Sequence, residues 1–155
     1  MTDRTTPAPA NLPSERTWPP GRVKVALRIR SNDLDPTELT ARLGVSPSFA
    51  ARHGDVTQRS DGPHVRRGGV WLYKMDATEG WDLDSAITQL LVSLPADTEL
   101  WADLQSRFRL DVFCGLFMGT DNHYAELRPS TIRLLGERGI ALTLDVYESP
   151  GAAAA

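Results

Sequence analysis

The residues of this chain that could carry out chemistry are concentrated at 46–69, a stretch rich in Gly, Ser and Arg. It shows no clean periodicity and is predicted to be a long loop. Compact domains rarely keep so long a connection without structure, so it either contains a short helix or has a functional role. Guanidinium groups in a Gly-rich segment suit the recognition of carboxylate or phosphate, because each planar group can donate two parallel hydrogen bonds. A solvated arginine run is the competing interpretation. The side chains on offer are Arg52, His53, Arg59, His64, Arg66 and Arg67.

Metal binding is a second chemistry that this stretch could support, since His53, Asp55 and His64 are all metal-ligating residue types. A metal site needs three or four ligands on a fixed scaffold, however, and these three lie in a segment interrupted by glycines. We therefore interpret them as solvated residues. We expect neither a metal nor any other cofactor.

Catalysis is not indicated by any residue combination in the sequence. Cys114 lies between Val112 and Leu116 in an alternating segment, so we expect a small core residue and not an activated nucleophile. The chain has no phosphate-binding loop, nucleophile elbow or dinucleotide-binding motif. We therefore assign no catalytic residue and favour a binding domain over an enzyme.

Alternating apolar residues predict four strands, at 22–30, 69–75, 107–117 and 140–147. The last of these strands is expected to bury four apolar residues, Ile140, Leu142, Leu144 and Val146.

Helical spacing predicts a helix after the first strand, with Asp35 as its N-cap, Pro36 in its first position and Gly44 at its end. A Leu-rich helix follows at 82–94, and the helical region extends to about 106. A rougher copy of the first strand-turn-helix arrangement occurs near the C-terminus. There Arg128 takes the place of the capping aspartate and has no acceptor, so Arg128→Asp is expected to stabilise that helix.

The outward face of the predicted sheet is a second candidate surface. It combines aromatic and charged side chains, namely Arg28, Arg30, Trp71, Tyr73, Asp111, Phe113, Asp145 and Tyr147. This face is either free for binding, or covered by the helix at 82–94 or by a second protomer. A nucleic acid partner is not expected, because Asp111 and Asp145 interrupt the basic residues and the net charge is −3.

The order of elements predicts an α+β fold. We expect a ferredoxin-like split βαβ repeat, with an antiparallel sheet of about four strands and an extra helical insertion between the halves. The chain is expected to form a single domain over 22–148, with a disordered Pro-rich arm at 1–21 and a flexible tail at 149–155.

A cytoplasmic location is expected from three features. The N-terminus has proline and threonine where a secretory signal would have an apolar run. The longest apolar stretch, 112–118, is far shorter than the roughly 20 residues of a membrane helix, so we expect no membrane association. The single cysteine agrees with a reducing compartment.

The segment 25–148 resembles a bacterial family, the domain of unknown function 4279. The resemblance rests on "LRIRSNDLDPTELTARLGVSP" at 27–47, "ARHGD" at 51–55, "GVWLY" at 69–73 and "LDVY" at 144–147, with a Leu-rich helix between the last two. It implies a small bacterial cytoplasmic protein with no assigned activity. Some members of this family resemble neighbours of toxin systems, which implies immunity-type binding.

These observations favour a non-catalytic binding domain that meets a protein partner through the Arg-rich segment and the adjoining sheet edge. The alternative is a small anionic ligand bound at the same segment. We expect a monomer or a homodimer. The predicted binding residues are Arg28, Arg30, Arg52, His53, Asp55, Arg66, Arg67 and Trp71.

Overall fold

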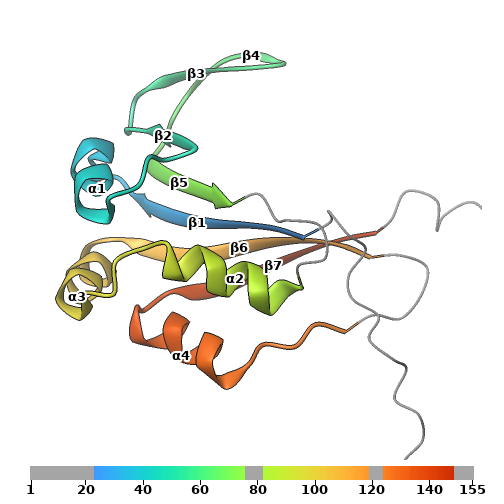
Figure 1. Ribbon diagram of the computed structural model, residues 1–155. Coiled ribbons are helices and arrows are strands. Elements are labelled where there is room, and N and C mark those ends of the chain that lie inside the picture. The colour runs from blue at the N-terminus through green and yellow to red at the C-terminus, as the bar shows by residue number, and fades with distance from the viewer. Residues whose placement is uncertain (1–22, 76–81, 119–123, 149–155) are drawn as a thin grey trace, which may run out of the picture.

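The computed structural model of the protein describes residues 23–75, 82–118 and 124–148. The arm predicted at 1–21 and the tail predicted at 149–155 lie outside the described residues. Within them the chain forms a five-stranded sheet, four helices and a separate two-stranded ribbon (Figure 1). None of the helices formed by the described residues is both long enough and apolar enough to cross a membrane.

The sheet has the strand order β2-β5-β1-β6-β7. The central strand β1 (Val23–Ser31) pairs antiparallel with β5 (Gly69–Met75) on one side and with β6 (Arg109–Met118) on the other. The short strand β2 (Phe49–Ala51) adds an edge next to β5. The opposite edge is β7 (Ala141–Glu148), which runs parallel to β6.

The α+β class is therefore confirmed, whereas the prediction of an antiparallel sheet of about four strands is wrong. The sheet is mixed and has five strands, and a ferredoxin-like arrangement is not confirmed. The reason lies in the helix α4 (Pro129–Glu137), which connects β6 to β7. A helical crossover returns the chain to the end where the first strand began, so the two strands can pair side by side in parallel.

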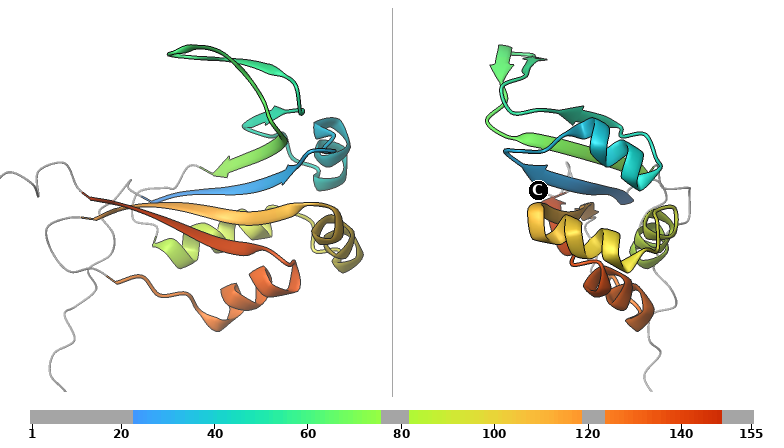
Figure 2. Two further views of the ribbon diagram at one scale, coloured as in Figure 1. Left: turned by 180° about the vertical axis from the view of Figure 1, so that it is seen from behind. Right: turned by 90° about the vertical axis from the view of Figure 1, so that its left-hand side faces the viewer.

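The helices pack on one face of the sheet and enclose a single hydrophobic core. They are α1 (Pro36–Leu43), α2 (Leu83–Val92), α3 (Thr98–Arg107) and α4. Viewed from behind, the sheet lies in front of α2, and no described helix covers the near face (Figure 2). We call that near side the open face. The helix at 82–94, now α2, therefore covers the core face of β1 and not the open face.

Trp71 and Tyr73 face the core, which corrects their predicted place on the outward face. They lie directly opposite Ile29 and Leu27 of β1, and residues paired across two strands point to the same side. Trp71 is fully buried, and its indole N–H donates to the hydroxyl of Thr40 at 3.1 Å. The alternation within this strand is as predicted, but the sequence does not say which of its two faces meets the core.

The segment 46–69 is not a long loop. It contains β2 and the ribbon, which consists of β3 (Val56–Arg59) and β4 (Gly62–Val65). The ribbon projects beyond the β2 edge of the sheet (Figure 1). Both of its faces meet solvent, so neither face needs apolar residues. The sequence of the ribbon therefore has no alternation of apolar and polar residues that would identify its strands.

The C-terminal strand is only partly buried, contrary to prediction. Ile140 is buried, Leu142 is half-buried, and Leu144 and Val146 are 48% and 55% exposed. Their cross-strand neighbours on β6 do face the core, so the predicted side is right. The strand is nevertheless an edge strand, and the helices of the described residues leave this part of it uncovered.

The two similar helices begin in different ways. In α1 the Asp35 side chain accepts the N–H of Thr37 at 3.0 Å, and Gly44 ends the helix at a φ of 69°, both as predicted. In α4 the N-cap Arg128 makes no side-chain cap, but its backbone N–H donates to the carboxylate of Asp84 at 2.7 Å. A buried residue of α2 thus fixes the backbone at the start of α4, while the N–H of Thr131 in the first turn donates to the carbonyl oxygen of Arg128 at 3.0 Å.

We expect Asp84→Ala to lower the free energy of unfolding by about 1–3 kcal/mol, because it leaves the Arg128 N–H without its acceptor.

For Arg128→Asp we now expect a lower free energy of unfolding and not a higher one, since a second carboxylate would then lie beside Asp84 and repel it. Urea denaturation measures both changes. The exposed Glu137 of α4 gives the control, because Glu137→Ala should change stability by less than about 0.5 kcal/mol. Unchanged stability in Asp84→Ala would contradict this account of the helix start.

Candidate functional site

A hollow of about 390 Å³ lies where the end of β1, the start of β6 and the connection from β4 to β5 meet. We call it the cationic hollow, because among the described residues that line it there are four arginines and a histidine but no Asp or Glu. These five basic residues are Arg30, His64, Arg66, Arg67 and Arg109, and the other lining residues are Ser31, Asn32, Gly68, Gly69 and Val70.

Strand register places two of these arginines side by side. Arg30 of β1 lies directly opposite Arg109 of β6, and both lie on the open face. Like charges that face each other across a strand pair destabilise a sheet. The adjacent pair on the same face is of opposite charge, Arg28 opposite Asp111.

Asp111 is committed to Arg28 and to its neighbour on β7. The Nε of Arg28 donates to one carboxylate oxygen at 3.0 Å, while its terminal nitrogen and the hydroxyl of Thr143 donate to the other. Burial by itself would raise the pKa of Asp111. The hydrogen bonds from Arg28 and Thr143, together with the charges of Arg28 and Arg30, outweigh burial and hold this pKa below its ordinary value. Arg28 also lies over the ring of Phe113, with 4.3 Å from its Cζ to the ring centroid.

Arg30 is much less firmly held. One terminal nitrogen lies 3.6 Å from the nearer oxygen of Asp111, which is beyond hydrogen-bond length, and its Nε is buried without an acceptor in the described part of the chain. Arg67 and Arg109, unlike Arg30, have no carboxylate within ion-pair distance among residues 23–75, 82–118 and 124–148. The hollow therefore contains guanidinium groups whose charge the described residues leave largely uncompensated.

The Gly68-Gly69 pair brings the arginine-bearing connection close to β1. A Cβ at Gly69 would lie 2.7 Å from the carbonyl oxygen of Ser31 and 2.8 Å from the Cβ of Leu34. A larger residue would therefore push the connection away from the end of β1. The close approach sets Arg66 and Arg67 near Arg30 around the same hollow.

The ribbon immediately precedes the arginines of the hollow in the sequence. Two backbone hydrogen bonds continue the pairing of its strands beyond Val56 and Val65. The N–H of Arg66 donates to the carbonyl of Asp55 at 2.8 Å, and the N–H of Gly54 donates to the carbonyl of Arg66 at 2.9 Å. The guanidinium of Arg66 lies over the ring of Phe49, with 5.7 Å from its Cζ to the ring centroid. Arg66 thus pairs with the ribbon through its backbone, contacts Phe49 at the sheet edge and lines the hollow.

The structure divides the predicted binding residues into three groups. Arg30, Arg66 and Arg67 line the hollow, and Arg28 lies next to it, paired with Asp111. Arg52, His53 and Asp55 do not line it, and Trp71 lies in the core. Arg52, His53 and Asp55 are not part of the hollow because Arg52 pairs with Asp35 at 2.7 Å, while Asp55 accepts the backbone N–H of Arg52 at 2.8 Å in the turn that contains the exposed His53.

Arg109 is the functional candidate that the sequence did not reveal. It belongs to a predicted strand, and only its register against β1 places it beside Arg30. The available signal is that Arg109 and Asp111, two residues apart, both lie on the outward side of that strand. His64 was recognised as part of the Arg-rich segment, and the structure places it in the hollow.

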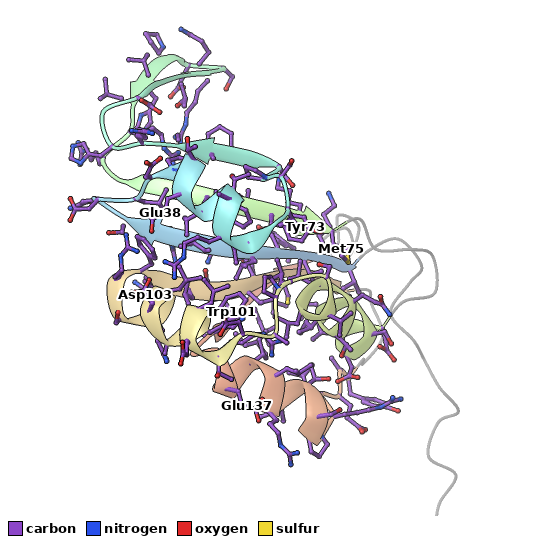
Figure 3. The ribbon with its side chains drawn as sticks, turned by 60° about the vertical axis from the view of Figure 1, so that its left-hand side comes forward. Glu38, Tyr73, Met75, Trp101, Asp103 and Glu137 are labelled. Atoms are coloured by element: carbon purple, nitrogen blue, oxygen red, sulfur yellow. The ribbon has the colours of Figure 1, made fainter. Side chains whose placement is uncertain are left out.

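A second group of charged residues joins α1 to α3 but offers no free charge. Arg107 donates to both carboxylate oxygens of Glu38, at 2.7 and 3.1 Å, and Arg42 contacts Asp103 at 2.5 Å. The labelled Glu38 and Asp103 come from these two helices (Figure 3). The hydrogen bonds from Arg107 lower the pKa of Glu38, and those from Arg42 lower the pKa of Asp103. Here acids and bases satisfy one another, in contrast to the hollow.

Cys114 is buried in the core, as predicted. Burial, reinforced by the charge of Asp111, raises the pKa of its thiol to about 12, so the unreactive protonated form predominates at neutral pH. Among residues 23–75, 82–118 and 124–148, no three or more His, Cys, Asp and Glu side chains are grouped in a way that could hold a metal ion.

Comparison with known proteins gives one match. The model of the family described as "Domain of unknown function (DUF4279)" matches residues 21–149. No curated protein and no solved structure matches the chain.

We expect Asp111→Asn to lower the free energy of unfolding by about 1–3 kcal/mol at neutral pH, because it removes the charge that Arg28 and Arg30 share. Since folding lowers the pKa of Asp111, its contribution is complete above the unfolded value near 3.8 and is lost as the pH falls through the lower folded value. The stability difference between the two proteins should therefore be constant from pH 7 to about pH 5 and should shrink below pH 3.8.

Denaturant unfolding at a series of pH values measures this difference. Asp61→Asn, the same substitution at an exposed turn of the ribbon, is the matched control and should behave as wild type. A difference that persists undiminished in acid would contradict the assigned role of the Asp111 carboxylate.

Proposed function

The chain belongs to the DUF4279 family, and from the geometry of its site we propose that it is a non-catalytic binding domain, which recognises a protein partner through the ribbon and the cationic hollow. The proposal keeps the expectations of a bacterial, cytoplasmic protein and of a partner other than nucleic acid. An immunity-type interaction is one form that such recognition would take.

The observation that carries this proposal is an exposed apolar pair on the ribbon beside uncompensated arginines. Val56 and Val65 lie directly opposite each other on β3 and β4 and are 61% and 59% exposed. A two-stranded ribbon gains little stability by itself in water, so the fold draws little benefit from exposing valines there. Apolar side chains next to arginines are typical of protein interfaces, where Arg is enriched.

Phe49 continues this surface from the ribbon to the sheet edge. Phe49 is 41% exposed, and its ring lies beneath the guanidinium of Arg66. Phe49 and the hollow therefore form adjoining parts of one surface, joined by Arg66, which both contacts Phe49 and lines the hollow. A partner that placed an anionic group in the hollow could cover Phe49 with a neighbouring apolar side chain.

A small anionic ligand is the second candidate, and one observation favours it. The volume of the hollow, about 390 Å³, lies within the range of small-ligand pockets. Such a ligand would use the arginines but leave the valines of the ribbon without a role. The protein partner accounts for both features, so it is the preferred function.

We expect the double variant Arg66→Ser/Arg67→Ser to weaken partner binding about tenfold or more, since interface arginines commonly dominate affinity. The tagged protein would capture a stoichiometric partner from lysate of the source organism, and the purified partner would then be titrated against each variant. Arg133→Ser, at an exposed position on α4, removes the same kind of charge elsewhere and should bind as wild type.

Val56→Ser/Val65→Ser tests the ribbon separately and should also weaken binding, with little change in melting temperature because both side chains are exposed. Normal affinity in both double variants would contradict the proposed surface. A bound small molecule detected by native mass spectrometry, with no protein captured, would favour the second candidate.

A further inference from the structure

We infer that the group bound in the cationic hollow is a phosphate monoester, a dianion, and not a carboxylate. The inference rests on the proposed function, because it names the chemistry of the group that the hollow recognises. The same chemistry is presented by a phosphorylated side chain of a protein partner and by a free small phosphate ester.

The number of uncompensated charges is the first argument. Four guanidinium groups line the hollow, and the described residues that line it include no Asp or Glu. One carboxylate brings a single negative charge, which would leave most of this positive charge unbalanced. A phosphate monoester brings a charge of about −1.5 to −2 and three strong acceptor oxygens. A dianion therefore matches this lining better.

The like-charge pair across β1 and β6 is the second and independent argument. Arg30 and Arg109 face each other directly, although such a pair weakens a sheet. The nearest carboxylate relieves it only in part, because Asp111 also accepts hydrogen bonds from Arg28 and Thr143 and lies 3.6 Å from Arg30. An anion between Arg30 and Arg109 would turn this repulsion into attraction. Costs of this kind are typical of binding sites, where function opposes stability.

The directions from which the donors come are the third argument. Arg30 comes from β1, Arg109 from β6, and Arg66 and Arg67 come from the connection to β5. A planar carboxylate is satisfied by the two parallel bonds of one guanidinium. The oxygens of a tetrahedral phosphate point in several directions and can accept from guanidinium groups on separate strands. The arrangement around this hollow is of the second kind.

Inorganic phosphate is the first probe. At constant ionic strength, and with chloride as the reference, phosphate should raise the melting temperature of the full-length protein, because a ligand that binds only the folded state stabilises it. Acetate, which presents a carboxylate, should raise it much less. Equal effects of phosphate and acetate, or no effect of either, would overturn the inference.

Arg109→Gln makes the test specific to the hollow. In chloride at low ionic strength this variant should melt above wild type, because it removes the repulsion from Arg30, and its response to phosphate should be mostly lost. Arg133→Gln, the same substitution on α4, should match wild type in both respects. A phosphate response that survives in Arg109→Gln would place phosphate elsewhere and overturn the inference.

The source of the phosphate is distinguished by three further probes, namely a short peptide containing phosphoserine, its counterpart with glutamate, and free O-phosphoserine. The phosphopeptide should bind at least about tenfold tighter than the glutamate peptide. If the phosphopeptide also binds tighter than free O-phosphoserine, a protein carries the group, and equal affinities indicate a free ester. Both results support a phosphate site.

Failure of this inference can be told from failure of the proposed function. If Arg66→Ser/Arg67→Ser loses the captured partner while the glutamate peptide binds as well as the phosphopeptide, the function holds and the phosphate assignment is wrong. If that variant retains its partner, the proposed surface itself is wrong.

Discussion

The buried carboxylate of Asp111 determines how charge is distributed on the open face. It accepts hydrogen bonds from Arg28 and Thr143 and so ties together three adjacent strands, β1, β6 and β7. Three hydrogen bonds from Arg28 and Thr143 orient this buried carboxylate, and Arg30 lies farther away, at 3.6 Å from the oxygen that accepts from the Nε of Arg28. The charge that could have balanced Arg30 and Arg109 is therefore used for the architecture of the sheet. The cationic hollow results from this commitment together with the register of β1 and β6.

The Gly68-Gly69 pair and the connection from the ribbon determine where the remaining arginines of the hollow lie. Gly69 packs against Ser31 and Leu34, so the chain returning from the ribbon passes close to the end of β1. Two more arginines then join those of the sheet, with Phe49 of β2 beneath one of them, Arg66. The helices take no part in this surface and hold the sheet from the other side. The hydrophobic core and the proposed binding surface thus lie on opposite faces of one sheet.

Local sequence signals predicted the elements well, because each depends on residues close together in the chain. Asp35 caps α1 and Gly44 ends it, and the alternation of β1 identifies its core face. Features that depend on pairing between distant segments could not be read in this way. The orientation of Trp71, the parallel pairing of β7 and the position of Arg109 beside Arg30 all require the register. The ribbon was missed for a different reason, since its two solvated faces carry no periodic pattern.

The central claim is that Arg30 and Arg109 repel each other, and that the described residues balance their charge only in part, through Asp111 at 3.6 Å from Arg30. A double-mutant cycle measures this repulsion most directly. Unfolding free energies of wild type, Arg30→Gln, Arg109→Gln and the double variant would be compared in chloride at low ionic strength. Because either single change already removes the repulsion, the account predicts that the double variant gains less stability than the sum of the two single changes. The coupling should also shrink as salt is added. Additive effects at low salt, or a coupling of the opposite sign, would contradict the account.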